Sequence, residues 1–155
     1  MESRKILFAF ALLLFLQSMC LSQRTVKAVP TKTEQSSAFQ SVTSSPAYAE
    51  VLLKKTELQS ELESLVIDYT EDYPKVVEIR YSLTVLQKAS ERMLAVKAAE
   101  SSKLTLALGK LIVRKIELET DLWSLQKNYK DDHPDVKRAK RKVEIYEAAI
   151  KEILG

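Results

Sequence analysis

The fold of this chain is decided by a stretch that occurs twice, sixty residues apart. Residues 57–76 read ELQSELESLVIDYTEDYPKV, and residues 117–136 read ELETDLWSLQKNYKDDHPDV. The two stretches align without a gap and share nine identities in twenty positions. A repeat at a fixed period means that one supersecondary unit is used twice. The sequence therefore predicts two structural copies, at about 48–95 and 108–155.

Each copy carries a tyrosine, an aspartate, a proline and a valine at matched positions between two helix-like patterns. Proline lacks an amide hydrogen and obstructs the preceding turn, so it ends one helix, yet it suits the first turn of the next. The aspartates are expected to accept free amides at the new helix start. The motif predicts a hairpin tip in each copy. The predicted turn residues are Tyr69, Asp72, Pro74, Val76, Tyr129, Asp132, His133, Pro134 and Val136.

Apolar residues before and after each proline step by three and four positions, as in Leu58, Leu62 and Leu65. This spacing places one narrow apolar seam along each helix and is typical of antiparallel helices packed at a shallow angle. Only two glycines and four prolines interrupt the chain, which favours long helices. We therefore expect an all-α fold of two tandem helical hairpins, packed as an antiparallel coiled coil.

The connection between the copies leaves two architectures open. No proline lies between Val76 and Tyr129, so the simplest arrangement has three helices at about 47–70, 75–129 and 134–154. The long middle helix would then place the two tips at opposite ends. A break near Ser101-Ser102 or Gly109 would instead fold the two hairpins into a four-helix bundle.

The start of the chain has the pattern of an export signal. Arg4 and Lys5 precede an apolar run at 6–16, which is long enough for a signal-peptide core and too short to span a bilayer. We expect residues 1–22 to be removed and the protein to be periplasmic or secreted. An uncleaved anchor is the alternative, and it would be the only membrane contact. Residues 23–46 are rich in serine and threonine and predict a flexible linker.

The residue types that support catalysis are scarce. The only cysteine, Cys20, lies in the signal, which removes thiol chemistry from the exported chain. The only histidine, His133, lies among aspartates that could hold a metal ion, but Tyr73 takes its place in the first copy, so a solvated tip is the preferred interpretation. The sequence predicts a non-enzyme with no metal site and no cofactor.

Two features could contact a partner. Trp123 replaces Glu63 of the first copy and is either a buried lateral contact or an exposed anchor. A basic cluster after the second tip is either a solvated face or a docking patch for an acidic protein or polymer. It lacks the interleaved aromatic residues of a nucleic-acid site, so no nucleic acid is expected. The basic cluster comprises Lys137, Arg138, Lys140, Arg141 and Lys142.

The second tip, YKDDHPDV at 129–136, resembles the coiled-coil segment of the polysaccharide chain-length determinant family. Those bacterial inner-membrane proteins carry a Tyr-x-x-x-His-Pro-Asp-Val turn. The first tip is a looser copy, with Tyr73 for histidine and Lys75 for aspartate. The family's two membrane-spanning helices have no counterpart in this sequence unless residues 6–16 count as half of one, and its mixed α/β region has none. The resemblance implies an exported relative of the coiled-coil part that acts near the assembly of envelope polysaccharide.

Together these features predict a structural or interaction protein of the bacterial cell envelope. Its partners would be proteins, or further copies of the chain, bound through the tips or the helical seams. The alternative is a small periplasmic chaperone that holds unfolded clients between its helices. An exposed apolar groove would favour the chaperone, and a fully paired seam would favour the scaffold.

Overall fold

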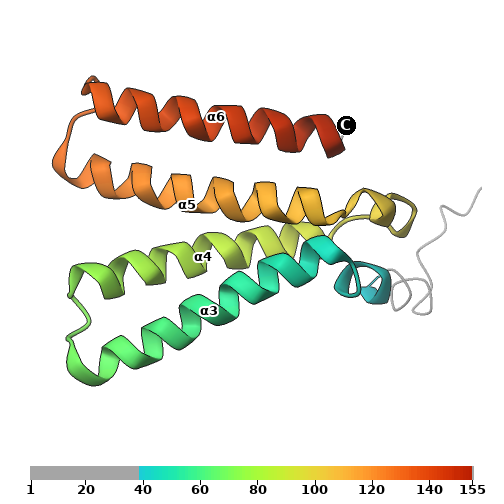
Figure 1. Cartoon of the computed structure of the whole chain (residues 1–155), viewed down its shortest axis with the longest axis horizontal. Helices are drawn as coiled ribbons and strands as arrows, with labels where there is room; N and C mark the ends of the chain where they lie inside the picture. Colours follow the sequence, from blue (N-terminus) through green and yellow to red (C-terminus); the bar gives the residue numbers. More distant parts are fainter. Residues whose placement is uncertain (1–38, 155) are drawn as a thin grey trace, which may run out of the picture. The chain divides into compact units, whose positions relative to one another are not determined.

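The computed structural model describes residues 39–154, all within the second of the chain's two compact units, Lys32–Gly155. The predicted signal peptide at 1–22 and the linker up to residue 38 lie outside the described residues. From 39 to 154 the chain forms helices and connecting turns with no strand, so the all-α prediction is confirmed. The elements are α3 (Pro46–Asp68), α4 (Pro74–Leu94), the 3-10 helix η1 (Ala98–Lys103), α5 (Leu106–Asn128) and α6 (Pro134–Leu154) (Figure 1).

The helices begin where the sequence supplies caps. Prolines stand in the first turn of α3 and α4, where a missing amide hydrogen costs nothing. The hydroxyl of Ser45 accepts the amide of Tyr48 at 3.3 Å, and that of Thr105 accepts the amide of Leu108 at 3.3 Å. Each hydroxyl satisfies one of the amides that a helix start leaves without an internal partner.

Consecutive helices pack in two pairs, α3 with α4 and α5 with α6 (Figure 1). In the first helix pair, Lys75 lies 4.0 Å from Glu61, and Lys55 donates to Gln87 at 2.8 Å. Partners earlier on α3 thus meet residues later on α4, so the two helices are antiparallel. In the second helix pair, the Lys103 ammonium near the start of α5 donates to the carbonyl of Leu154 at the end of α6. That pair is antiparallel as well.

The two helix pairs are joined in parallel register through α3 and α5. The amide of Ala47 donates to the carbonyl of Leu104 at 3.2 Å, and Lys54 pairs with Glu117 at 3.0 Å. A Cβ at Gly109 would lie 2.8 Å from the Cα of Ala47, so glycine permits this close approach. Because α3 and α5 run in the same direction, both tips lie at the same end (Figure 1). The expectation of tips at opposite ends is wrong.

The prediction of one continuous middle helix is also wrong. The chain leaves the helix after Leu94, passes through η1 and re-enters helix at Leu106. The break lies around the Ser101-Ser102 pair, whereas Gly109 lies inside α5. Leu104 explains why a break is favoured, since it is 2% exposed and its carbonyl receives the amide of Ala47. Burial and this long-range hydrogen bond outweigh the local preference for helix.

The core lies toward the end at which α3 and α5 begin, and α6 contributes little to it. Residues 39–43 are helical and Val42 is fully buried, so the end of the predicted linker is part of the fold. Helix α6 packs mainly on α5, and Val136 is its buried residue. Helix α6 therefore lies at the edge of the four-helix arrangement. The main core cluster consists of Val42, Ala47, Val51, Leu86, Met93, Leu104, Leu108 and Ile116.

Candidate interaction surfaces

The two tips, residues 69–73 and 129–133, have the same backbone hydrogen bonds. In each, the first residue donates to the last turn of the preceding helix, and the last residue donates back across the turn. A third bond starts the next helix. The matched pairs are Tyr69→Leu65 and Tyr129→Leu125 at 2.9 Å, Tyr73→Thr70 and His133→Lys130 at 3.0 Å, and Val77→Tyr73 and Lys137→His133 at 3.1 and 3.0 Å.

Each tip presents two stacked rings. Tyr69 and Tyr73 stack with centroids 4.1 Å apart and planes 17° apart. Tyr129 and His133 stack at 4.2 Å and 27°. Tyr69 is 46% exposed and Tyr129 is 45% exposed, so these rings lie on the surface. The stacking was not predicted, although its signal is visible as a ring at the same two positions of both copies.

The remaining predicted turn residues have different roles. Val76 and Val136 are fully buried and fix the start of α4 and α6 against the preceding helix. Pro74 and Pro134 are the first residues of those helices. Asp72 and Asp132 are exposed and accept no hydrogen bond within residues 39–154. The prediction that these side chains accept free backbone amides at the start of the next helix is therefore wrong.

His133 caps α6. Its Nδ1 accepts the backbone amide of Asp135 at 3.3 Å, whereas Tyr73 offers α4 no side-chain cap. The imidazole therefore acts as the N-cap of α6 and also stacks on Tyr129. Within the described part of the chain, no group of three or more histidine, cysteine or carboxylate side chains is placed to hold a metal ion.

An equivalent ion pair joins each tip to the helix that follows. Arg80 donates to Glu71 at 2.7 Å in the first copy, and Lys140 lies 3.0 Å from Asp131 in the second. Both pairs span the same positions of the repeat. Hydrogen bonds from Lys140 and then Gln126 hold the pKa of Asp131 below its usual value. The repeat thus preserves the charge relation and changes both residue types.

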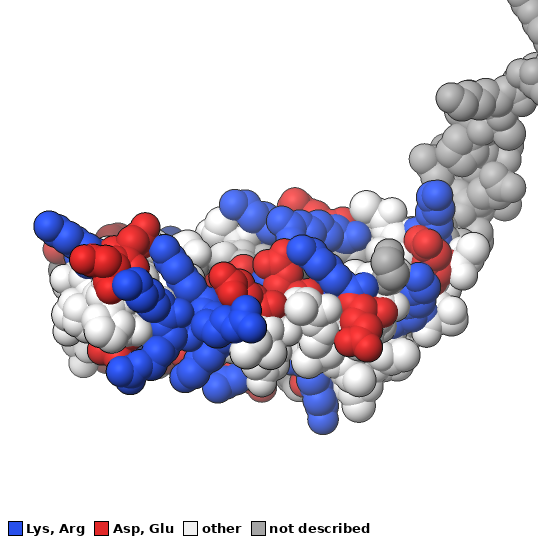
Figure 2. All heavy atoms as spheres, turned by 90° about the horizontal axis from the view of Figure 1, so that it is seen from above, with Lys and Arg blue, Asp and Glu red and all other residues white. Residues whose placement is uncertain are grey.

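The basic cluster covers the first half of α6, at the end where that helix begins (Figure 2). Three of its five members have acidic neighbours, namely Lys140 with Asp131, Arg138 with Asp135 at 3.5 Å, and Arg141 with Glu144 at 3.1 Å. Lys137 and Lys142 form no ion pair with any residue in 39–154. The surface therefore retains excess positive charge beside the second tip.

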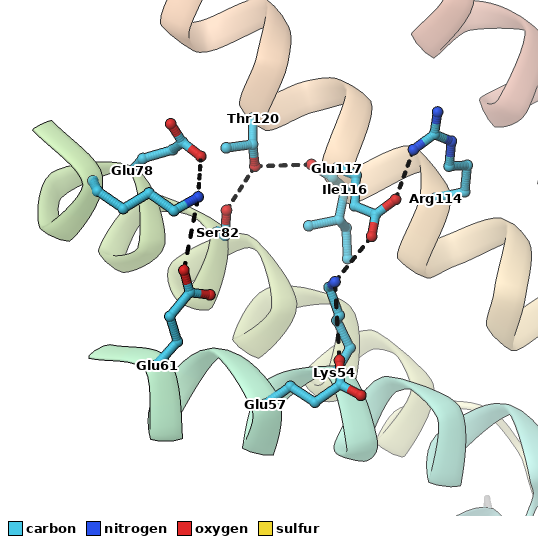
Figure 3. Close-up of polar contacts among 10 residues, drawn as sticks. Lys54, Glu57, Glu61, Glu78, Ser82, Arg114, Ile116, Glu117 and Thr120 are labelled. Carbon is cyan, nitrogen blue, oxygen red and sulfur yellow. Dashed lines mark hydrogen bonds and ion pairs between the residues drawn. The ribbon is translucent and has the colours of Figure 1, made fainter. Parts of the chain in front are cut away.

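Polar groups meet where the first helix pair packs on α5, and two of them, Ser82 and Thr120, are buried there (Figure 3). Glu117 receives Lys54 at 3.0 Å and Arg114 at 2.8 Å. Burial opposes the ionisation of Glu117, but the hydrogen bonds from Arg114 and Lys54 prevail and lower its pKa. Nearby, the hydroxyls of Ser82 and Thr120 lie 2.8 Å apart, and Thr120 donates to the carbonyl of Ile116. These contacts specify how the first pair meets α5.

Trp123 makes a lateral contact between α5 and α4. Its ring stacks on Tyr81 with centroids 4.3 Å apart and planes 5° apart. The Lys127 ammonium lies 3.4 Å from the ring centroid, within the range of a cation–π contact. Burial in this stack, and then the charge of Glu119, raise the pKa of Tyr81. Of the two interpretations of Trp123, the structure favours the lateral contact.

An open groove of about 480 Å³ lies between α4, α5 and α6. Its lining is mostly apolar and includes Val85, Met93, Ile112 and Ile150, together with charged side chains such as Arg92 and Glu147. Hydrophobic residues on α6 are thus only partly covered. The groove is the feature that the chaperone alternative requires.

None of the described helices combines the length and apolar character that a membrane-spanning segment needs. Comparison of the chain with protein-family models, with curated proteins and with solved structures found no match.

Proposed function

We propose that this protein is an exported, non-enzymatic helical scaffold of the bacterial cell envelope that binds protein partners through its two tips. The observation that carries this proposal is the repeated pair of stacked, exposed rings. A tyrosine ring left on the surface contributes little to folding, yet both copies place one at the same position. Tyrosine is among the residue types that carry most of the energy at protein interfaces.

The placement of the tips supports a role in binding. Because α3 and α5 are parallel, both ring pairs lie at one end of the helices and can engage a single partner surface together. Two linked contacts bind more tightly than either alone, since the second forms at high effective concentration. The basic cluster beside the second tip adds attraction for an acidic protein or an acidic polymer.

The finer parts of the proposal rest on the sequence. Export rests on the signal-like residues 1–22, and the link to polysaccharide assembly rests on the resemblance of 129–136 to the chain-length determinant family. We infer further that the two helix pairs act as tandem hairpins of the antiparallel coiled-coil kind. The antiparallel contacts Lys75–Glu61 and Lys55–Gln87 support that arrangement.

A periplasmic chaperone of the holdase type is the second candidate, and the groove between α4, α5 and α6 favours it. The apolar residues of its lining could hold an extended hydrophobic segment of an unfolded client. The two candidates use different surfaces. A scaffold binds through the tips, and a holdase binds through the groove.

Photo-crosslinking in cells that express the full-length chain separates the candidates. A photoreactive amino acid is placed at Asp72 or Asp132 at the tips, or at the exposed Lys97 near the far end as a matched control. A scaffold gives one or two discrete products from the tips and none from Lys97. Replacing Tyr69 and Tyr129 with alanine should remove those products. Crosslinks to many unrelated exported proteins, unaffected by the ring substitutions, would contradict the proposal and favour the holdase.

A further inference from the structure

The face of the first helix pair that α5 covers has an uncovered counterpart on the second pair. Seven residues of the first pair line the contact with α5, and five of them have counterparts in a second hollow, namely Leu58, Glu61, Lys75, Glu78 and Ser82. Adding sixty to each number gives five residues that line an open hollow of about 300 Å³ between α5 and α6. They are Leu118, Asp121, Asp135, Arg138 and Lys142.

The face of α5 that packs on the first helix pair also has an uncovered counterpart, on α3. Five residues of α5 line that contact, namely Val113, Ile116, Glu117, Thr120 and Asp121. Their equivalents sixty residues earlier line an open hollow of about 590 Å³ along α3. They are Leu53, Thr56, Glu57, Ser60 and Glu61. Leu53 is 56% exposed here, whereas its counterpart Val113 packs against the core.

We propose that a second copy of this chain docks head to tail, so that α3 of one copy lies in the α5–α6 hollow of another. The contact between copies would repeat the packing between the two helix pairs of a single chain. In repeat proteins each unit packs on its neighbours and the end units expose the same faces, which here form two unlike and complementary ends. A second copy is the occupant because it alone carries both faces in the matching register.

Charge complementarity supports this occupant. Within one chain, Lys54 pairs with Glu117, and the equivalent contact between copies joins Arg114 to Glu57. Within one chain Tyr81 stacks on Trp123, and the equivalent positions between copies place Arg141 opposite Glu63. Each of these positions brings a basic residue of the second pair to an acidic residue of α3.

A second set of positions uses the basic cluster. The hydrogen bond between Ser82 and Thr120 corresponds to Lys142 opposite Ser60. The sixty-residue shift replaces Lys75, which lies near Glu61 within a chain, with Asp135. In the hollow between α5 and α6 the positive charge is instead supplied by Arg138 and Lys142, which would face Glu61 of the docked copy. The exposed side of α3 carries Glu57, Glu61 and Glu63, so the basic cluster meets an acidic surface.

The backbone approach can be repeated with a small adjustment. Gly109 lies against Ala47 within the chain, and the equivalent pair between copies is Ala49 against Ala107, both of which are exposed. The methyl group of Ala49 would hold the two helices slightly further apart than α3 and α5. Small residues at this crossing still allow close packing of the helices.

The resulting assembly is heterologous, since the two contacting faces differ. Such a contact leaves one unused face at each end and therefore closes into a ring or continues as a filament. Because every copy places both tips at one end, the assembly would present its ring pairs along one edge. This inference deepens the proposed scaffold role and rests on it for its biological meaning.

Charge reversal tests the contact. Arg141→Glu and Glu63→Arg each place like charges opposite one another, and the double variant restores attraction with reversed signs. Sedimentation velocity of the purified full-length chain should show concentration-dependent association. We expect each single variant to weaken it by about ten-fold or more, and the double variant to regain it. The matched control is Lys151→Glu, an equal charge change on α6. The first-copy equivalent of Lys151 is Glu91, which lies beside Lys55 and Gln59 of α3. By the repeat, Lys151 therefore faces α5 of its own chain and not the docked copy.

Mixing the two single variants distinguishes a head-to-tail contact from a symmetric one. In the mixture every favourable contact joins unlike chains, because the glutamate introduced at position 141 meets the arginine introduced at position 63, and the intact Arg141 meets the intact Glu63. A head-to-tail contact therefore continues as alternating longer species, whereas a symmetric contact stops at mixed dimers. A parent chain that stays monomeric at several hundred micromolar overturns the inference. So does association that is unchanged by either single variant, or that responds to only one of them.

The failure of this inference is distinguishable from failure of the proposed function. Self-association is measured with the purified chain alone, whereas tip binding is measured as crosslinks to other proteins in cells. Discrete tip crosslinks with a monomeric chain would refute the head-to-tail contact and leave the scaffold proposal standing. Assembly without tip crosslinks would support the contact and refute the binding role of the tips.

Discussion

The two helix pairs have nearly the same tips and very different surroundings. Six residues of α4 are buried, whereas Val136 is the one buried residue of α6 between Pro134 and Leu154. The tips agree because their hydrogen bonds and ring stacks form within a few residues of one another. The helices differ because α4 packs on both α3 and α5, and α6 packs mainly on α5. The repeat thus determines local structure, and neighbours determine burial.

Ion pairs of the two copies show the same principle for charge. Lys75 and Glu78 lie 3.0 Å apart on α4, and the equivalent residues of α6 are Asp135 and Arg138 with the charges exchanged. Hydrogen bonding to Glu78 raises the pKa of Lys75, although burial partly opposes this. An exposed ion pair depends on opposite signs at the right spacing, so the exchange preserves the local contact. The exchange removes the second contact of Lys75, with Glu61 of α3, because the equivalent residues Asp135 and Asp121 are both acidic. It also changes the charge that the surface offers to a partner.

The largest expected difference between the pairs is at the position of Leu86 and Tyr146. Leu86 is fully buried, so Leu86→Ala should lower the free energy of unfolding by about 2–5 kcal/mol. Tyr146 is partly exposed on α6, so Tyr146→Ala should cost clearly less. Urea denaturation at a concentration that keeps the chain monomeric measures both values. Equal losses would contradict the view that α6 is the less covered helix.

The next effect concerns the close approach of α3 and α5. Gly109→Ala places a methyl group 2.8 Å from the Cα of Ala47, and the resulting backbone shift should cost about 1–3 kcal/mol despite the better helix propensity of alanine. Ala49→Gly at the equivalent position of α3 should cost about 0.5–1 kcal/mol through helix propensity alone. Thermal unfolding of both variants checks the order. A Gly109→Ala variant as stable as the parent would mean that the two helices are free to move apart.

The third comparison is between Glu117 and its equivalent Glu57. The pKa of Glu117 is lower in the folded chain than in the unfolded chain, so its stabilising effect is present above the unfolded value and is lost as the pH falls through the folded one. Glu117→Gln should therefore reduce the loss of unfolding free energy between neutral and acid pH, by about 1 kcal/mol or less because the group is partly screened by solvent. Glu57→Gln is the control, since Glu57 is 57% exposed and 4.0 Å from Lys54. If the unfolding free energy of Glu117→Gln falls with acid pH as that of the parent does, the role assigned to the ion pair is refuted.

The tips could be predicted from the sequence because their causes are local. Proline ends and restarts a helix wherever it stands, and a valine two positions later becomes buried in both copies. The break between α4 and α5 could not be predicted as firmly. Its residues include no proline or glycine, and it is held by a hydrogen bond between Ala47 and Leu104, which are far apart in the sequence.

The error at the break accounts for the error in the placement of the tips. A continuous helix would have carried the second tip to the far end, whereas the turn through η1 reverses the chain and brings both tips to one end. Among the site residues, the positions of Tyr129 and His133 were predicted from the repeat. Their stacking and the cap formed by His133 depend on side-chain geometry that spacing does not specify.

The smallest expected effect is at the ring position where the tips differ, and exchange of the two residues tests it directly. His133→Tyr keeps a ring to stack on Tyr129 but removes the acceptor for the amide of Asp135, so it should cost about 0.5–1 kcal/mol. Tyr73→His supplies the same acceptor to α4, which has no side-chain cap, and should stabilise the chain by a similar amount. Chemical denaturation of both variants gives the two values. Opposite signs would show that the tips share one geometry in which only the histidine caps, whereas losses in both would mean that each ring is adjusted to its own tip.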